Sequence, residues 1–337
     1  MTEKNHAAVD LSGCCVLVTP TTFGQADPAL KSTLETSVGK VIYNPFGRPL
    51  VAAELVPRVR DVDGYIAGLD QIDASVMEAA VRLKVIARYG VGIDRVDVPA
   101  ATRRGIVVTN TPGANSAAVA EMALALMLAL GRGLCRADRA ARRGEWPRAM
   151  GIGLRGKTVG LVGFGAIGRE VAARLKGFGC RILATDPYAT PGAIKGAGVE
   201  PVSIDALLAA ADFVSLHASV TPSTENMVDA SFLGKMKRGA FLVNTARGEL
   251  IDEPALQDAL EGGRLQGAAL DCFRVEPPPA GHALLQLPQV LATPHMSAHT
   301  DEAANAMGRM SLEACLAVLR GEQPLHAVNP EAWTGHR

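Results

Sequence analysis

Two histidines stand four positions apart in the stretch TPHMSAHT, at His295 and His299. Side chains at i and i+4 share one face of a helix, and this spacing also occurs in zinc sites. The pair is therefore consistent with a metal site, with one proton-transferring histidine and a bystander, or with two unrelated side chains. Pro294 places His295 in a loop, and no third ligand lies at a recognisable spacing. We therefore expect no metal here.

Two other polar residues follow apolar runs in the same part of the chain. Arg247 comes directly after AFLVNTA (240–246), and Glu276 comes shortly after LQGAALD (265–271). Ligands of parallel α/β sheets bind outside the carboxyl ends of the strands, so Arg247, Glu276 and His295 are expected to converge there. A base, an orienting acid and a cation are the groups needed to oxidise a 2-hydroxy acid. Singly, Arg247 could instead cap a helix or pair with an acid, and Glu276 could simply be exposed.

A glycine motif indicates a nucleotide site. The stretch VGLVGFGAIGRE contains G-x-G-x-x-G directly after an apolar run and at the start of a helical pattern. Glycines let backbone amides approach a pyrophosphate, and the helix N-terminus supplies partial positive charge. An aspartate about 20 residues further on would bind the ribose hydroxyls and repel a 2′-phosphate, which favours NAD over NADP. The predicted cofactor residues are Gly163, Gly165, Ala166, Ile167, Gly168 and Asp186.

Short apolar runs alternate with Ala- and Leu-rich helical patterns along most of the chain. Fully apolar strands between helices indicate parallel strands covered on both faces, so we expect two α/β blocks, each with a doubly wound parallel sheet. Long helices are expected at about 116–133 and 301–321. The expected strands lie within 14–20, 62–68, 83–90 and 105–110 in the first block, and within 157–165, 180–186, 212–218, 240–246 and 265–271 in the second.

Composition narrows the class of protein. The chain has 337 residues, enough for two domains, and its formal charge of +0 gives no reason to expect nucleic acid or an anionic membrane as a partner. The most apolar helix candidate, 117–131, contains Glu121 and is too short to cross a bilayer. The six cysteines form no C-x-x-C pair, and the first ten residues lack the pattern of a secretory signal. We therefore expect a cytoplasmic protein with reduced thiols.

The chain resembles the D-isomer-specific 2-hydroxyacid dehydrogenase family in several segments that occur in order over nearly its whole length. The segments are IARYGVGIDRVD, VVTNTPGANSAAVAE, GLVGFGAIGREVAARLKGFG, VNTARGELIDEPAL, GAALDCFRVEPP and TPHMSAHT. The most similar branch is the phosphoglycerate-dehydrogenase-like group, in a short form without a regulatory domain. The resemblance implies a Rossmann-type cofactor domain, residues 112–297, inserted into a flavodoxin-like substrate domain, residues 1–111 and 298–337. It also implies a homodimer in which residues 116–148 pack across a two-fold axis.

The resemblance assigns roles to matching positions. His295 would be the general acid/base, Glu276 would fix its tautomer, and Arg247 would bind the substrate's carboxylate and carbonyl oxygens. Asp271 matches a residue near the nicotinamide carboxamide, and His299 is interpreted as a helix-start or cleft-lining side chain. Other cofactor positions are His217, Ala218, Thr245, Ala246 and Ser297, and the substrate positions are Arg88, Tyr89, Gly90, Val91 and Gly92.

Three departures from the family pattern bear on the site: Gly68 and Ser297 on the choice of substrate, and the 218–220 run on the shape of the nicotinamide loop. Gly68 stands about where phosphoglycerate dehydrogenases carry an arginine for the substrate phosphate. The run Ala218-Ser219-Val220 replaces an apolar residue followed by Pro-Leu, and Ser297 replaces a glycine beside the nicotinamide. The added hydroxyl of Ser297 could narrow the pocket or bind a polar substrate.

The predicted function is an NAD-dependent oxidoreductase that transfers a hydride between nicotinamide and a small (R)-2-hydroxy acid or 2-keto acid. Candidate acids are 3-phosphoglycerate, glyoxylate and hydroxypyruvate. An alternative from another class is a non-enzymatic, corepressor-like protein that senses NAD(H) and binds partners on the same fold. The complete set of Arg247, Glu276 and His295 argues against it. Formate dehydrogenases are a third possibility, but they require longer insertions and an N-terminal extension.

Overall fold

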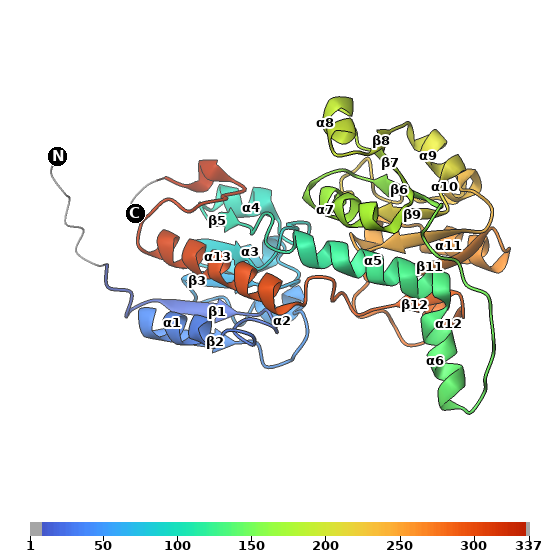
Figure 1. Cartoon of the computed structure of the whole chain (residues 1–337). Coiled ribbons are helices and arrows are strands. Elements are labelled where there is room, and N and C mark those ends of the chain that lie inside the picture. The colour runs from blue at the N-terminus through green and yellow to red at the C-terminus, as the bar shows by residue number, and fades with distance from the viewer. Residues whose placement is uncertain (1–8, 335–337) are drawn as a thin grey trace. The chain divides into compact units, whose positions relative to one another are not determined.

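The computed structural model describes residues 9–334 (Figure 1). Residues 1–8, where the sequence shows no secretory pattern, and 335–337, the end of the expected substrate domain, lie outside the described residues. The chain forms two compact units, which meet in sequence at Asn115/Ser116 and Ala298/His299. Unit 1 contains the first segment and the last one, and unit 2 is the segment inserted between them.

Unit 1 is built on a parallel sheet of five strands among the described residues, in the order β2-β1-β3-β4-β5. This is the flavodoxin-like order. The sequence did not predict β2, because this four-residue edge strand has no fully buried position and so lacks a continuous apolar run. The strands are β1 (Cys15–Val18), β2 (Lys40–Tyr43), β3 (Gly64–Ala67), β4 (Val85–Arg88) and β5 (Val107–Thr109). The helices are α1 (Ala29–Ser37), α2 (Ala52–Leu55), α3 (Ala74–Ala79), α4 (Val98–Arg103) and α13 (Asp301–Leu319), with a short 3₁₀ turn, η3 (Pro330–Ala332).

Unit 2 is built on a parallel sheet that has seven strands within the described part of the chain, in the order β12-β11-β10-β9-β6-β7-β8. Counted from β6, this is the Rossmann order 3-2-1-4-5-6 with one strand added at the edge, and the order reverses beside β6. The strands are β6 (Thr158–Val162), β7 (Arg181–Thr185), β8 (Glu200–Pro201), β9 (Phe213–Leu216), β10 (Ala240–Asn244), β11 (Leu265–Leu270) and β12 (Val290–Ala292). The prediction of two doubly wound parallel sheets is confirmed.

Helices cover both faces of the sheet of unit 2, which explains why its strands are apolar throughout (Figure 1). On one face, Phe213 and Phe241 stack with their ring centroids 4.9 Å apart. The helices are α5 (Ser116–Arg132), α6 (Leu134–Arg142), α7 (Ala166–Leu175), α8 (Pro191–Gly196), α9 (Ile204–Ala210), α10 (Ala230–Lys235), α11 (Glu253–Glu261) and α12 (Ala283–Gln286), with 3₁₀ turns η1 (Lys176–Phe178) and η2 (Gly248–Leu250).

The apolar helix predicted at 116–133 is α5, which packs against α7 and against strands β10 and β11. The residues of α5 that are buried in unit 2 account for its apolar composition. Within residues 9–334 no single helix is long and apolar enough to cross a membrane; α5 and α6, which meet at a bend of 60°, would pass that test only as a pair.

Candidate active site

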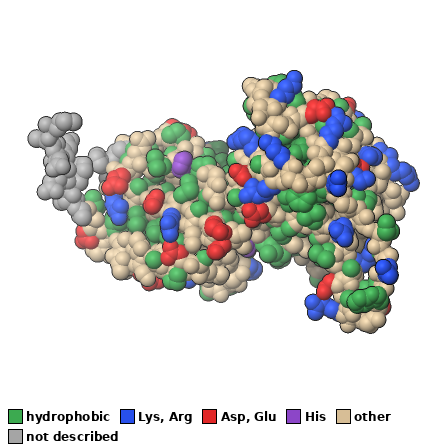
Figure 2. All heavy atoms as spheres, viewed as in Figure 1, with side chains coloured by type: hydrophobic (Ala, Val, Ile, Leu, Met, Phe, Trp, Pro, Cys, Tyr) green, Lys and Arg blue, Asp and Glu red, His purple; other side chains and the backbone are tan. Residues whose placement is uncertain are grey.

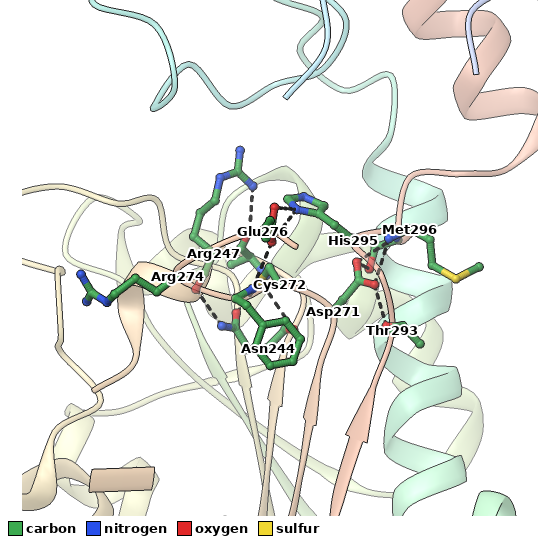
Figure 3. Close-up of polar contacts among 12 residues, drawn as sticks. Asn244, Arg247, Asp271, Cys272, Arg274, Glu276, Thr293, His295 and Met296 are labelled. Atoms are coloured by element: carbon green, nitrogen blue, oxygen red, sulfur yellow. Dashed lines mark hydrogen bonds and ion pairs between the residues drawn. The ribbon is translucent and has the colours of Figure 1, made fainter. Parts of the chain in front are cut away.

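Arg247, Glu276 and His295 come from loops that follow three neighbouring strands of unit 2. Arg247 lies just beyond β10, Glu276 beyond β11 and His295 beyond β12. Because these strands are adjacent and parallel, their carboxyl ends meet at one edge of the sheet. Figure 3 shows the three side chains gathered there, whereas Arg274 points away from them.

The imidazole of His295 is paired with the carboxylate of Glu276. Its Nδ1 lies 3.0 Å from Oε1 and 2.8 Å from Oε2 of Glu276, and both side chains are largely buried. The backbone N–H of Phe273 also donates to Oε1 of Glu276, at 3.0 Å. Since a carboxylate only accepts hydrogen bonds, Nδ1 must carry the ring proton. Nε2 of His295 is then the nitrogen that can take a proton from a bound molecule.

The backbone of His295 adopts a left-handed conformation with φ of 50°. This conformation is rare for residues other than glycine and costs about 1 kcal/mol or more, so surrounding contacts must maintain it. The N–H of His295 donates to the carbonyl of Asp271 at 2.8 Å and to that of Thr293 at 3.1 Å. The residue is therefore held in place through its main chain as well as its ring.

Arg247 stands at the start of the 3₁₀ turn η2, in a loop that Asn244 holds in shape. The side-chain amide of Asn244 donates to the carbonyl of Arg247 at 2.7 Å and accepts from the N–H of Ala246 at 3.0 Å. One guanidinium nitrogen of Arg247 donates to the carbonyl of Ala246 at 2.7 Å. The sequence analysis did not predict this role for Asn244, which is completely buried at the end of β10. The only signal in the sequence was a polar residue at the end of an apolar strand.

The glycine motif has the geometry that a pyrophosphate site requires. Gly163 has φ of 99°, and a Cβ there would lie 2.6 Å from the carbonyl group of His217. A Cβ at Gly168 would lie 2.4 Å from the carbonyl oxygen of Gly163, so this glycine allows the helix to pack closely on the strand. A Cβ at Gly165 would meet no protein atom within 4 Å. This open space lies at the N-terminus of α7, whose first turn receives no side-chain cap.

Asp186 follows β7 and faces the same turn. Its carboxylate accepts the N–H of Phe164 at 2.7 Å, and on the other oxygen the N–H groups of Tyr188 and Ala189 at 2.7 and 3.1 Å. Partial burial works to raise the pKa of Asp186, but these backbone donors, helped by the charge of Arg169, outweigh it and lower the pKa. The carboxylate is thus ionised at neutral pH, as a ligand for ribose hydroxyls must be.

Two predicted cofactor residues carry buried polar atoms at the carboxyl edge of the sheet. Neither the ring nitrogens of His217 nor the hydroxyl of Thr245 have a hydrogen-bond partner within residues 9–334. Burial lowers the pKa of His217 to about 4, so its ring is neutral at pH 7. Ala218 and Ala246 directly follow these two residues in the loops after β9 and β10. Orphaned polar atoms at the edge of the sheet that also carries the glycine turn fit a bound polar cofactor.

The predicted substrate residues of unit 1 differ in their contacts. Tyr89 and Gly90 were expected to offer backbone N–H groups, but these donate to the carbonyls of Ala67 at 2.9 Å and Arg88 at 3.0 Å. Arg88 is 3% exposed, and its guanidinium donates to the carbonyls of Ala67 at 3.2 Å and Tyr89 at 2.9 Å. It therefore supports the ends of β3 and β4 from inside the unit. Val91 and Gly92 are partly exposed, and neither donates its backbone N–H to another group in residues 9–334. Their N–H groups are therefore available to a carboxylate, whereas Arg88 lies inside the unit.

The second histidine of the opening pair belongs to unit 1, whereas the first belongs to unit 2. His299 is exposed in unit 1, directly before Thr300, whose hydroxyl caps α13. Among the residues that the structure describes, no group of three or more His, Cys, Asp or Glu side chains is placed to hold a metal ion.

Comparison with known proteins identifies the family. Residues 124–297, just over half of the chain, match the model described as "D-isomer specific 2-hydroxyacid dehydrogenase, NAD binding domain". The chain belongs to this family. The sequence-based assignment to the D-isomer-specific 2-hydroxyacid dehydrogenases is thus confirmed, and the matched domain is the one that binds NAD.

Curated relatives and a solved structure extend the likeness beyond that domain. The chain is 43% identical over 284 residues to a D-3-phosphoglycerate dehydrogenase of Methanocaldococcus jannaschii, covering 83% of this chain and 54% of the relative. It is 44% identical over 284 residues to a glyoxylate reductase of Korarchaeum cryptofilum, covering 82% and 86%. The crystal structure of the TT0316 protein from Thermus thermophilus superposes with a TM-score of 0.83, at 41% identity, covering 93% of this chain and 99% of that one. The chain therefore spans about half the length of the first relative and most of the other two.

The glycine motif generates a first prediction. Gly163→Ala should weaken NADH binding at least tenfold, because the new Cβ would push the 217–218 loop away from the turn. NADH titration followed by fluorescence measures the effect. Gly177→Ala is the matched control, since a Cβ at Gly177 meets nothing within 4 Å. Equal affinities in the two variants would contradict the assignment of the turn.

Asp186 generates a second prediction, on cofactor choice. Asp186→Ala should weaken NADH binding about tenfold or more and leave NADPH binding unchanged or improved, because charge-assisted hydrogen bonds are worth about 1.5–3 kcal/mol. Both dissociation constants should be measured in the wild type and in Asp205→Ala, which removes an exposed aspartate of the same unit. A ratio of NADH to NADPH affinity that stays at the wild-type value in Asp186→Ala would exclude the ribose role.

Proposed function

We propose that the protein is an NAD-dependent oxidoreductase that transfers a hydride between nicotinamide and a small (R)-2-hydroxy acid or 2-keto acid. The observation that carries the proposal is the His295–Glu276 pair at the carboxyl edge of a sheet that also bears the glycine turn. The names of its relatives, D-3-phosphoglycerate dehydrogenase and glyoxylate reductase, support this class of reaction. Family membership and the NAD-binding domain support it over the corepressor-like alternative.

In the oxidation direction, Nε2 of His295 accepts the proton of the substrate hydroxyl. Glu276 holds Nδ1–H and stabilises the imidazolium that forms, since an opposite charge in contact favours the charged ring. Arg247 binds the oxygens of the substrate. In unit 1, the backbone N–H groups of Val91 and Gly92 are the donors that we propose for a carboxylate. Bound NAD supplies the acceptor for the hydride that leaves the carbinol carbon.

The loop after β3 favours an acid without a phosphate group. A Cβ at Gly68 would lie 3.3 Å from Oδ2 of Asp70 and 3.4 Å from the backbone of Pro20, so a side chain here would be crowded. The N–H of Gly68 is itself bonded to Asp70 and to the hydroxyl of Thr19. The position thus offers neither a cation nor a free donor to a phosphate. Glyoxylate and hydroxypyruvate are accordingly preferred over 3-phosphoglycerate among the three candidates.

An exposed apolar surface supports a homodimer. We define the arm as residues 134–150, which comprise α6 and the chain that follows it (Figure 1). Leu134, Trp146 and Met150 on the arm are 60%, 84% and 96% exposed. Figure 2 shows hydrophobic side chains at the free end of α6 next to charged ones. Large apolar side chains gathered at such a site are typical of protein contacts, and a second copy of the chain is the partner we propose.

We also propose that the protein works in the cytoplasm. All six cysteines are free, from Cys14 to Cys315, and these thiols are compatible with a reducing compartment. No further partner, nucleic acid or membrane is part of the proposal.

The test of function is NADH consumption with glyoxylate, hydroxypyruvate, phosphohydroxypyruvate and pyruvate. The wild type should turn over at least one unphosphorylated acid, and His295→Ala should lose at least 100-fold in kcat with NADH binding nearly intact, because general-base catalysis contributes about 10²–10⁴-fold. His326→Asn serves as the control, since His326 is exposed and asparagine tolerates its φ of 61°. Tight NADH binding without turnover of any acid would favour the binding-protein alternative instead.

The arm generates a separate prediction. Trp146→Asp should convert the dimer to a monomer, because it places a charge in the apolar contact, whereas Val81→Asp should leave the mass unchanged although Val81 is 72% exposed. Size-exclusion chromatography with light scattering measures both. A Trp146→Asp protein that keeps the dimer mass would remove the arm as the interface.

A further inference from the structure

Unit 2 contains a second histidine–glutamate pair, away from His295. Nε2 of His282 lies 3.1 Å from Oε2 of Glu253, and the two side chains are 14% and 20% exposed. Glu253 is the first residue of α11, and His282 directly precedes α12. Nδ1 of His282 is buried without a hydrogen-bond partner in residues 9–334, so within that range Glu253 gives the ring its only hydrogen bond. A buried polar ring that keeps a single partner calls for an explanation.

The pair contacts the segment that carries Glu276. We define the glutamate loop as residues 273–276. Oε1 of Glu253 accepts the backbone N–H of Arg274 at 3.2 Å, while Oε1 of Glu276 accepts that of Phe273 at 3.0 Å. Two consecutive N–H groups of the loop are thus each held by the carboxylate of a different histidine–glutamate pair. Figure 3 shows Glu276, at the end of this loop, next to His295.

The peptide group between Phe273 and Arg274 is closely enclosed. A Cβ at Gly248 would overlap both the carbonyl carbon of Phe273 and the nitrogen of Arg274. Phe273 is buried, and its ring meets that of His282 edge to face, with the centroids 5.5 Å apart. Gly248 directly follows Arg247 in the chain, so this peptide group also touches the loop of the candidate cation. Its orientation therefore matters on both sides.

Loss of the Glu253 carboxylate would leave the N–H of Arg274 without this acceptor. Backbone donors in the interior are normally paired, so the peptide group would turn toward another acceptor or toward water. That rotation would draw the adjacent N–H of Phe273 away from Glu276. The Glu276 carboxylate would then lose the contact that aligns it with Nδ1 of His295.

We propose that Glu253 is a positioning residue that acts on Glu276 through the glutamate loop, and that His282 fixes the Glu253 carboxylate. The proposal rests on the proposed function, in which Glu276 holds the general acid/base His295. A purely structural role is the competing explanation, because an acid in the first turn of a helix is favourable by itself. The two roles differ in whether a change at Glu253 reaches His295.

The first experiment compares Glu253→Leu with Glu253→Gln in kcat and NADH affinity. The value of kcat in Glu253→Leu should be about tenfold below the wild type, a part of the roughly 10²–10⁴-fold that acid/base catalysis contributes. Glu253→Gln should stay within about threefold, because its amide oxygen can still accept the N–H of Arg274. The NADH dissociation constant should stay within about twofold in both, since no hydrogen bond of Glu253 involves the glycine turn.

Asp205→Ala is the matched control, because it removes an exposed first-turn acid from α9 of the same unit and should keep the wild-type kcat. Two outcomes would overturn the proposal. One is a kcat in Glu253→Leu equal to that of Asp205→Ala. The other is NADH affinity that falls as far as kcat, which indicates general damage to unit 2.

A matched pair at His282 keeps the test informative should Glu253→Leu fail to fold. His282→Gln places an NH₂ donor near the position of Nε2, whereas His282→Leu has similar bulk and no donor. The value of kcat should fall about three- to tenfold in His282→Leu and return to near the wild-type value in His282→Gln. Equal kcat values in the two variants would overturn the role of the donor.

A spectroscopic readout separates this proposal from the proposed function. In protein labelled with ¹⁵N-histidine, long-range correlations from the carbon-bound ring protons report which nitrogen carries the proton, and the His295 signals are assigned by their absence in His295→Ala. At alkaline pH the wild type and both glutamine variants should show His295 with its proton on Nδ1. Glu253→Leu and His282→Leu should show in addition the form with the proton on Nε2, which free histidine prefers.

An unchanged His295 tautomer in the two leucine variants would overturn the positioning role and leave the dehydrogenase function standing. The expected tautomer change in a protein whose wild type turns over no acid would have the opposite meaning. It would support the action of Glu253 on His295 and refute the dehydrogenase.

Discussion

The register of three parallel strands is the constraint on which the site depends. Backbone pairing aligns Asn244 at the end of β10 with Leu270 at the end of β11, and Leu270 with Ala292 at the end of β12. The loops that follow therefore leave the sheet from one row. Slipping one strand by a residue would move its side chains to the opposite face and carry its loop out of line. Long-range hydrogen bonding between strands, more than any local feature, brings a cation, a carboxylate and an imidazole together.

Buried carboxylates hold loops at the ends of strands in both units by the same physical means. In unit 1, Asp70 accepts the N–H of Leu50 at 2.7 Å, the hydroxyl of Tyr65 at 2.9 Å and the N–H of Gly68 at 2.9 Å, as well as the hydroxyl of Thr19. In unit 2, Asp271 is satisfied in the same manner by Thr293 and Met296, which flank His295. A buried charge that lost one donor would carry a desolvation penalty of about 1–3 kcal/mol or more, so such loops tolerate little rearrangement. Rigid loops on a rigid sheet keep a side chain in close placement, as the role proposed for His295 requires.

Within the D-isomer-specific 2-hydroxyacid dehydrogenase family, the chain keeps the dinucleotide pattern in unit 2 and departs from the family pattern at single positions in both units. The glycine turn, Asp186 and the strand order of unit 2 follow the usual dinucleotide pattern. Two of the three departures from the family pattern are at Gly68 and Ser297. The first removes a side chain where crowding by Asp70 and Pro20 leaves little room, and the second adds a hydroxyl that bonds to Asp271. In each case the changed position contacts an aspartate of the same unit, Asp70 for Gly68 and Asp271 for Ser297.

The sequence by itself determined the elements and the motifs, because these depend on local patterns. Apolar runs predicted β1, β3, β4 and β5 and most strands of unit 2, the helix at 301–321 agrees with α13, and the glycine spacing located the dinucleotide turn. The edge strands β2 and β8 were not predicted, because an edge strand is half exposed and has no continuous run of apolar residues. Only the tertiary structure decided what the polar residues contact. Arg88 donates to carbonyl groups inside unit 1, and Asn244 donates to the carbonyl of Arg247. Asp271 accepts hydrogen bonds from the loop of residues 293–297. Ala67 lies 21 positions from Arg88, and Ser297 lies 26 positions from Asp271. Which donor meets which acceptor over such separations is set by strand order and register, and no local pattern encodes these.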